Sequence, residues 1–88
     1  MNTFLLNVAT PDGNRFDGQA VALSVRGIEG ELMVMAGHIP FVTTVKAGGC
    51  TIDLPDSERI NATLDGGILT VGAEKVTLLS GSFKESAE

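Results

Sequence analysis

Residues 21–34 read Val-Ala-Leu-Ser-Val-Arg-Gly-Ile-Glu-Gly-Glu-Leu-Met-Val. Apolar residues occupy every second position at the start of this stretch and again at its end, on either side of a break flanked by Gly27 and Gly30. A period of two places successive side chains on opposite faces of a strand, and glycine is typical of the turn between two strands. The stretch therefore predicts two β-strands joined by a turn, each with one apolar face.

The same pattern recurs on both sides of this stretch. Further strands are predicted around residues 4–8, 41–45, 50–54, 60–64, 69–71 and 76–78. The breaks between them are rich in Gly, Pro, Asp and Asn, and the chain holds eleven glycines in total. Short strands at regular spacing, with turn residues between them and no helical period, are typical of an all-β sandwich or barrel. We predict an all-β sandwich.

The phase of the alternation predicts which side chains form the core. These are Phe4, Leu6, Val8, Phe16, Val21, Leu23, Val25, Leu32, Val34, Ile52, Leu54, Ile60, Leu64, Leu69, Val71, Val76 and Leu78. The opposite phase is also partly apolar, at Leu5, Ala9, Ala20, Ala22, Met33, Met35 and Leu79. A partner that covers part of the outer surface would explain this second set. The alternative is an ordinary scatter of apolar residues, because much of any protein surface is apolar.

Length and charge narrow the classes of partner. A chain of 88 residues can hold one compact core, so we predict a single domain. The net charge of −5 disfavours phosphate backbones and anionic lipid surfaces, and nucleic acid is therefore not expected as a partner. The longest apolar run is far shorter than the roughly 20 residues of a transmembrane helix, so membrane association is expected only through a partner. The lone cysteine and the lack of a leader pattern at the start fit a reducing cytoplasm.

The chain offers few residues for chemistry. A zinc site needs three or four ligands of suitable type, and this sequence has one histidine, His38, and one cysteine, Cys50. The carboxylates of Asp53, Asp56 and Glu58 crowd one turn, where a solvated acidic turn is favoured over a cation site. No catalytic, cofactor or metal residues are predicted, and we do not expect an enzyme. From spacing alone His38 is interpreted as a loop residue that forms local hydrogen bonds.

Two segments carry a resemblance to a known family. The sequence Arg-Gly-Ile-Glu-Gly-Glu-Leu at 26–32, followed by Gly-His-Ile-Pro-Phe at 37–41, resembles the G-x-E-G-E-L…G-H-x-P-[FL] segment of the epsilon subunits of rotary F-type ATP synthases. Residues 8–18 resemble the V-x-[TS]-P…F-x-G opening of the family, and residues 66–79 resemble its last hairpin. The resemblance covers nearly the whole chain.

The resemblance implies a fold and a mechanical role. The fold is a flattened β-sandwich of two sheets with about ten short strands, expected over residues 1–82, with a short charged C-terminal tail at 83–88. The role is that of a non-catalytic central-stalk, or rotor, subunit that binds gamma and contacts the c ring, coupling proton flow to ATP synthesis. Such a subunit lies at the cytoplasmic face of the bacterial inner membrane, held there through the complex. The implied gamma contacts are Thr10, His38 and Thr43, and the implied c-ring contacts are Glu29, Gly30 and Glu31.

One departure from the family pattern is large. Typical epsilon subunits continue into two C-terminal helices that regulate or inhibit ATP hydrolysis, whereas this sequence ends at Glu88 without them. The sequence is either a naturally short epsilon subunit or a chain cut after the sandwich, and a start at Met with no visible tag favours the first. The competing interpretations are a stand-alone small β-sandwich binding module for a small ligand or sugar, and a small enzyme. The absence of Trp and Tyr disfavours the sugar-binding module, because such a site is expected to have an exposed aromatic platform.

Overall fold

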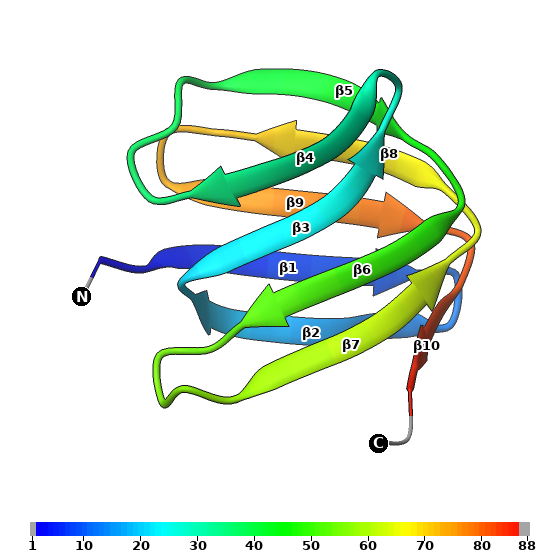
Figure 1. Ribbon diagram of the computed structural model, residues 1–88, viewed down its shortest axis with the longest axis horizontal. Helices are drawn as coiled ribbons and strands as arrows, with labels where there is room; N and C mark the ends of the chain where they lie inside the picture. The colour runs from blue at the N-terminus through cyan, green and yellow to red at the C-terminus, as the bar shows by residue number, and fades with distance from the viewer. Residues whose placement is uncertain (1, 87–88) are drawn as a thin grey trace.

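The computed structural model describes residues 2–86, which form β-strands joined by turns and loops. The ten strands are β1 (Phe4–Thr10), β2 (Gly13–Ala20), β3 (Ala22–Gly27), β4 (Gly30–Met35), β5 (Phe41–Val45), β6 (Gly48–Asp53), β7 (Arg59–Leu64), β8 (Gly67–Val71), β9 (Lys75–Ser80) and β10 (Phe83–Glu85). They lie in two layers with a common core between them (Figure 1). The prediction of an all-β sandwich is confirmed.

The two layers are parts of one continuous set of paired strands. The strand order is β10-β7-β6-β3-β5-β8-β9-β1-β2, and β4 pairs with β3 beside this path. One layer contains β4, β3, β6, β7 and β10, and the other contains β5, β8, β9, β1 and β2 (Figure 1). The layers join at a corner, where Gly27 of β3 is paired with Val45 of β5. Pairing is antiparallel except between β1 and β9, which run parallel.

The β3–β4 hairpin has the register that the apolar alternation predicts. Leu23 pairs with Val34 and Val25 pairs with Leu32. Leu23, Val25 and Val34 are all fully buried, because the period of two directs these side chains into the space between the layers. The turn lies between Gly27 and Gly30, as predicted.

Two strands were not predicted from the alternation. Strand β2 carries mostly exposed polar residues, and it is held by antiparallel pairing with β1 from Phe4–Ala20 to Thr10–Gly13. Strand β10 pairs with β7, and Phe83 in it is only 4% exposed. Phe83–Glu85 therefore belong to the sheet, although the sequence analysis placed them in a charged tail. Of that predicted tail, residues 87–88 lie outside the described residues.

The core contains residues that the alternation predicts, together with six buried residues that it did not place there: Ala20, Ala22, Val45, Cys50, Ala62 and Phe83. The predicted core residues that are buried are Leu6, Val8, Leu23, Val25, Val34, Ile52, Leu64, Leu69, Val71, Val76 and Leu78, and the others are partly buried. Ala20 and Ala22, which the alternation placed on the outer surface, are buried instead. Ala20 shares the inward phase of Phe16 on β2, and the bend at Val21 shifts this phase before β3 begins. Ala22 keeps the outward phase of β3, but its small side chain lies between the paired residues Met35 of β4 and Asp53 of β6.

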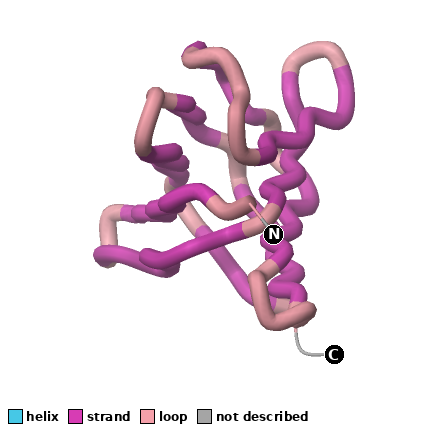
Figure 2. The backbone as a smooth tube through the Cα atoms, turned by 90° about the vertical axis from the view of Figure 1, so that its left-hand side faces the viewer, coloured by secondary structure: helices cyan, strands magenta, loops and turns pink. Residues whose placement is uncertain are grey.

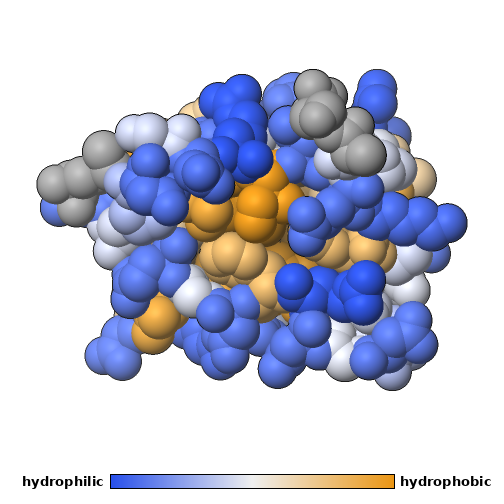
Figure 3. Space-filling view, turned by 90° about the horizontal axis from the view of Figure 1, so that it is seen from below, coloured by the Kyte–Doolittle hydropathy of each residue, from blue (hydrophilic) through white to orange (hydrophobic). Residues whose placement is uncertain are grey.

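The outline of the molecule follows from these layers. The principal extents are 29 × 28 × 24 Å, so the sandwich is only slightly flattened. Strand hairpins project at both ends of the layers, as the side view shows (Figure 2). From below, on the side where β2 and β7 lie, apolar atoms are visible between hydrophilic side chains (Figure 3). Residues 2–86 contain no helix long and apolar enough to cross a lipid bilayer.

Candidate protein-binding surfaces

The three residues predicted to contact the c ring lie together at the tip of the β3–β4 hairpin. Glu29, Gly30 and Glu31 are all exposed. Gly30 has a φ of 129°, a conformation that side chains other than glycine rarely adopt, so the turn depends on glycine here. Neither glutamate forms an ion pair with another part of residues 2–86. The tip therefore presents two free carboxylates on a short, well-defined turn.

The residues predicted to contact gamma do not form one cluster. Thr10 lies at the end of β1, where its hydroxyl accepts a hydrogen bond from the Asp12 N–H at 3.2 Å. His38 lies in the β4–β5 loop, at the opposite end of the molecule from Thr10 (Figure 1). Thr43 lies on β5 and is partly buried, because it shares the phase of the buried residue Val45. Thr10 and His38 could contact one partner together only if that partner spans the molecule.

His38 has a local structural role in its loop. Its Nδ1 lies 3.1 Å from the Met35 carbonyl oxygen and 3.3 Å from the Met35 nitrogen. Its ring centroid lies 6.4 Å from that of Phe41, at a tilt of 45°. These contacts agree with the interpretation of His38 as a loop residue that forms local hydrogen bonds. The imidazole is nevertheless exposed and remains accessible to a partner.

An apolar surface extends across the outer side of β5, β8, β9 and β1. Pairing aligns Thr44 with Ile68, Ile68 with Leu79, and Leu79 with Ala9, so these four side chains form one row across the sheet. Ile68 and Leu79 are exposed by 51% and 52%. We call this row, together with its outward-facing neighbours, the outer apolar face. Contiguous exposed apolar surface of this kind is typical of a protein-binding site.

A second row on the outer apolar face is also uncharged. It aligns Val42 with Thr70, Thr70 with Thr77, and Thr77 with Asn7, and Val42 is exposed by 66%. Leu5 lies on the same side of β1 and is 44% exposed. These two rows hold hydroxyl, amide and aliphatic side chains and no charged ones, so the face could pack against a partner without burying a charge.

Sequence reasoning found only part of the outer apolar face. The sequence analysis placed the apolar residues Leu5, Ala9 and Leu79 on the outward-facing side of their strands. Val42 and Ile68 were missed, although Ile68 lies beside the predicted core residue Leu69 and Val42 lies in a predicted strand. The signal that joins them is the cross-strand register, which brings residues far apart in the chain into one row.

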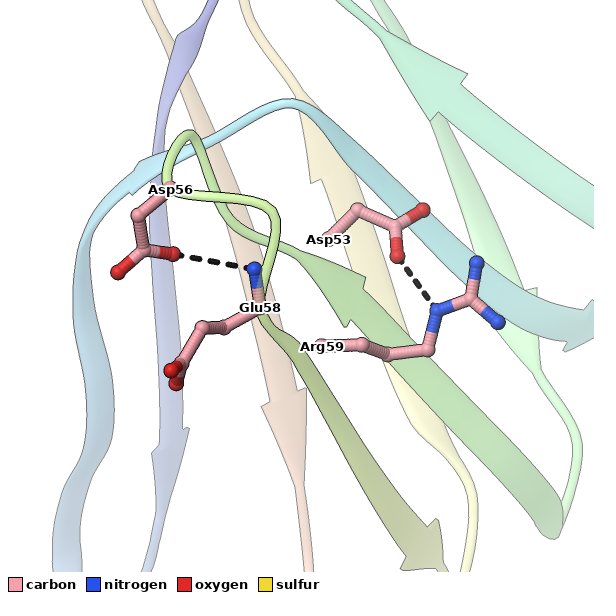
Figure 4. A network of polar contacts seen from close by, with 4 residues as sticks. All are labelled: Asp53, Asp56, Glu58 and Arg59. Atoms are coloured by element: carbon pink, nitrogen blue, oxygen red, sulfur yellow. Dashed lines mark hydrogen bonds and ion pairs between the residues drawn. The ribbon is translucent and has the colours of Figure 1, made fainter.

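The acidic turn between β6 and β7 is occupied by contacts within the protein (Figure 4). Asp53 forms an ion pair with Arg59, with Oδ1 and Nε 2.6 Å apart. Asp56 accepts a hydrogen bond from the Glu58 N–H at 3.1 Å. In the close-up the carboxylates of Asp53 and Asp56 point to different partners. Among the residues that the structure describes, no three His, Cys, Asp or Glu side chains are grouped to hold a metal ion.

Cys50 is a buried core residue on β6. Its side chain is 2% exposed, and burial raises the pKa of its thiol to about 11. A thiol is nucleophilic as the thiolate, so Cys50 is essentially unreactive near neutral pH. Cys50 therefore serves as a packing residue of the core.

Comparison with known proteins identifies the family. Residues 3–86 match the family described as "ATP synthase, Delta/Epsilon chain, beta-sandwich domain". The chain is 38% identical over 78 residues to the "ATP synthase epsilon chain, sodium ion specific" of Acetobacterium woodii, a match that covers 89% of this chain and 59% of that protein. It is 36% identical over 88 residues to the ATP synthase epsilon chain of Bacillus velezensis, covering 100% of this chain and 65% of the relative. The chain thus spans about three fifths of the length of these relatives.

Solved structures support the same fold. A chain in the cryo-EM structure of the Euglena gracilis mitochondrial ATP synthase, containing OSCP, F1 and the c ring, has a TM-score of 0.89 to this protein at 20% sequence identity. The match covers 94% of this chain and 53% of that chain. At this identity the likeness concerns the fold. Together with the family match over residues 3–86, it shows that the chain belongs to the family of ATP synthase delta/epsilon-chain β-sandwich domains.

Proposed function

We propose that this chain is a central-stalk subunit of an F-type ATP synthase, which binds gamma and contacts the c ring and thereby couples proton flow to ATP synthesis. The observation that carries the proposal is the match to ATP synthase epsilon chains over nearly the whole chain, at up to 38% identity. The subunit is non-catalytic and contributes binding surfaces to an ATP-synthesising complex. It lies at the cytoplasmic face of the bacterial inner membrane and associates with the membrane through the complex.

The outer apolar face is the surface that best suits gamma. Val42, Ile68 and Leu79 are each more than half exposed on it, and burying such side chains against a partner is favourable by about 25 cal/mol per Å² of apolar surface. Thr43 lies on β5 at the border of this face, Thr10 lies at the end of β1, and His38 lies in the loop before β5. In this proposal gamma covers the face and reaches these three residues at its margins.

The acidic hairpin tip suits the c ring. Glu29 and Glu31 stand at the end of a hairpin, where a loop on a rigid scaffold can reach a separate partner. Their free carboxylates would face positively charged or amide groups of the c-ring loops. Because exposed ion pairs contribute only about 0.2 to 1 kcal/mol each, we expect that neither glutamate is essential alone.

The test reverses the charge of the hairpin tip. The double variant Glu29→Lys/Glu31→Lys places like charges opposite one another, an arrangement that can cost several kcal/mol. We expect fewer protons pumped per ATP hydrolysed in membranes that carry this variant, with an unchanged melting temperature of the isolated chain.

The matched control is Glu58→Lys/Glu85→Lys, which makes the same change in charge at two exposed glutamates away from the tip. Its coupling should equal that of the wild type. Equal loss of coupling in both variants would assign the effect to overall charge, and normal coupling in both would exclude the tip as the c-ring contact.

A further inference from the structure

The sandwich has an open side where two strand edges are unpaired. Strand β5 pairs with β8 along its whole length, from Phe41–Val71 to Val45–Gly67, and its other edge meets β3 only at Val45. Strand β4 pairs only with β3. Both β4 and β5 lie at the top of Figure 1, at the borders of the two layers. An unpaired strand edge is a ready template for a strand from another chain.

A groove lies between these two strand edges. Its volume is about 550 Å³, and it is lined by Gly27, Ile28, Glu29, Gly30, Glu31, Leu32, Phe41, Val42 and Thr43. Leu32 and Phe41 are partly buried and pack against the core, whereas Ile28 is 57% exposed. The groove thus combines apolar walls with backbone from the edge of β5.

The backbone of β5 directs hydrogen-bonding groups into this groove. The Lys46 N–H donates to the Arg26 carbonyl at 2.8 Å, so it points away from β8 and toward β3. Backbone N–H and C=O groups alternate between the two edges along a strand, so those of Thr44 and Val42 point the same way as those of Lys46. Val42 therefore offers a donor and an acceptor to any strand that lies beside β5.

The lining of the groove continues the surface proposed to bind gamma. Val42 belongs to both the groove and the outer apolar face, and Thr43, one of the gamma contacts that the family resemblance implies, also lines the groove. A segment of gamma that covers the outer apolar face would therefore reach the groove.

We infer that the groove between β4 and β5 takes an extended segment of gamma, which adds as a further strand to the edge of β5. The side chains of this segment that face the groove are apolar, to match Leu32 and Phe41. Addition of an extended segment to a sheet edge is a recurrent mode of peptide recognition, in which main-chain hydrogen bonds supply affinity. The added strand would continue the outer apolar face, because Val42 belongs to both. This inference rests on the proposed binding of gamma.

The test compares Val42→Pro with Val42→Ala. Proline removes the N–H that points into the groove and leaves the bonds between β5 and β8 intact, and proline is tolerated at a strand edge of this kind. We expect Val42→Pro to bind a gamma-containing catalytic complex about tenfold more weakly than Val42→Ala, the loss that corresponds to roughly one net hydrogen bond. The second measurement is amide hydrogen exchange of the wild-type chain, in which the amides of Val42 and Thr44 should slow by roughly tenfold or more on binding.

The outcomes separate the inference from the proposed function. If the wild-type chain binds the complex but the two amides exchange unchanged, or the two variants bind equally, the strand addition is wrong and the proposed function stands. If the wild-type chain does not bind the complex at all, both are wrong. Protection of the same amides in the isolated chain, with dimers seen by light scattering, would assign the edge to a second copy and contradict the inference. The exchange measurement decides the matter if Val42→Pro fails to fold.

Discussion

At the residue scale, single side chains have roles that their type alone does not specify. Cys50 is the lone thiol of the chain, and it functions as a small apolar residue because it is buried in the core. Asp53 belongs to a cluster of acidic residues in the sequence, yet its carboxylate is paired with Arg59 across β6 and β7. His38 is exposed but held by contacts with the Met35 backbone. In each case the neighbours in space decide the role.

The raised pKa of Cys50 predicts a pH dependence of stability. The folded state holds the thiol proton up to a pKa of about 11, whereas an unperturbed thiol loses it near pH 8.5. The folded state therefore binds more protons between these values, and stability falls as pH rises through this window. The two values differ by more than two pKa units, each of which corresponds to about 1.4 kcal/mol, so we expect the free energy of unfolding to decrease by about 3 kcal/mol across the window.

Urea denaturation at pH 8 and pH 10.5 would measure this dependence. The control is Cys50→Ala, which has no titrating thiol and should show a smaller decrease between the two pH values. An equal decrease in wild type and variant would assign it to other groups, such as the lysines. Below pH 8 the stability contribution of the thiol should be constant.

Alanine substitutions at two glycines should have opposite effects on the stability of the protein. A Cβ at Gly67 would overlap the carbonyl oxygen of Leu79 on the adjacent strand, whereas a Cβ at Gly49 has no atom within 4 Å. We expect Gly67→Ala to destabilise the protein by about 3 kcal/mol or more, since both contacting groups are backbone in the β8–β9 ladder. Gly49→Ala should be neutral or slightly stabilising. Thermal melts of the two variants would compare them, and equal melting temperatures would contradict the close approach of β8 and β9.

At the scale of elements, local pattern accounts for some strands and pairing for others. The β3–β4 hairpin follows from its alternation and its glycines, so it could be predicted from 14 residues of sequence. Strand β2 has few apolar residues, and β10 is three residues long. Both are strands because they pair with β1 and β7, which are themselves anchored in the core. Ser86 extends the second pairing, since its N–H donates to the Asn61 carbonyl at 2.7 Å.

Because strand β10 carries a core residue, shortening one side chain near the end of the chain should strongly destabilise the protein. Phe83 is 4% exposed and belongs to the core cluster, so Phe83→Ala should destabilise the protein by about 3 kcal/mol, the lower range for a buried phenylalanine. Lys84→Ala on the same strand is the control, because Lys84 is exposed and should contribute little. Denaturant titration of the two variants would measure the difference. A stability loss below about 1 kcal/mol for Phe83→Ala would mean that residue 83 lies outside the core.

At the scale of the whole molecule, the two layers present different outer surfaces. One has the outer apolar face on β5, β8, β9 and β1, with Lys75 at its margin beside Leu5. The other carries Met33 and Met35 beside charged residues such as Arg26 and Glu31. A protein that binds two partners can thus use one broad face for the first and a projecting hairpin for the second.

The asymmetry of the two surfaces gives a matched pair of variants. Leu79 and Met33 are each 52% exposed, one on the outer apolar face and the other on the opposite layer. We expect Leu79→Lys to weaken binding to a gamma-containing complex by about 2 kcal/mol, because a charge would be buried against an apolar partner. Met33→Lys should bind nearly as the wild type does. Binding affinities from surface plasmon resonance would test this, with melting temperatures as the control for folding. Equal weakening by both variants would exclude the outer apolar face as the gamma-binding surface.

The sequence by itself determined which side chains face the core in most strands, because alternation is a local property of neighbouring residues. It also determined the family, through short motifs such as 26–32. Its error at Ala20 came from the bend at Val21, since a single bend shifts the phase of the alternation. Its error at Ala22 came from the neighbouring strands β4 and β6, which lie on both sides of that small side chain.

Only the tertiary structure decided how residues far apart in the chain meet. The parallel pairing of β1 with β9 aligns Ala9 with Leu79 and completes the outer apolar face. The same structure places the end of β1, where Thr10 lies, and the β4–β5 loop, which contains His38, at opposite ends of the molecule (Figure 1). The physical reason is that strand pairing links segments through backbone hydrogen bonds, which every residue type except proline can form in full. The order of side chains along a strand therefore specifies which of its faces is apolar. Which strands pair with one another is decided only when all of them pack around one core.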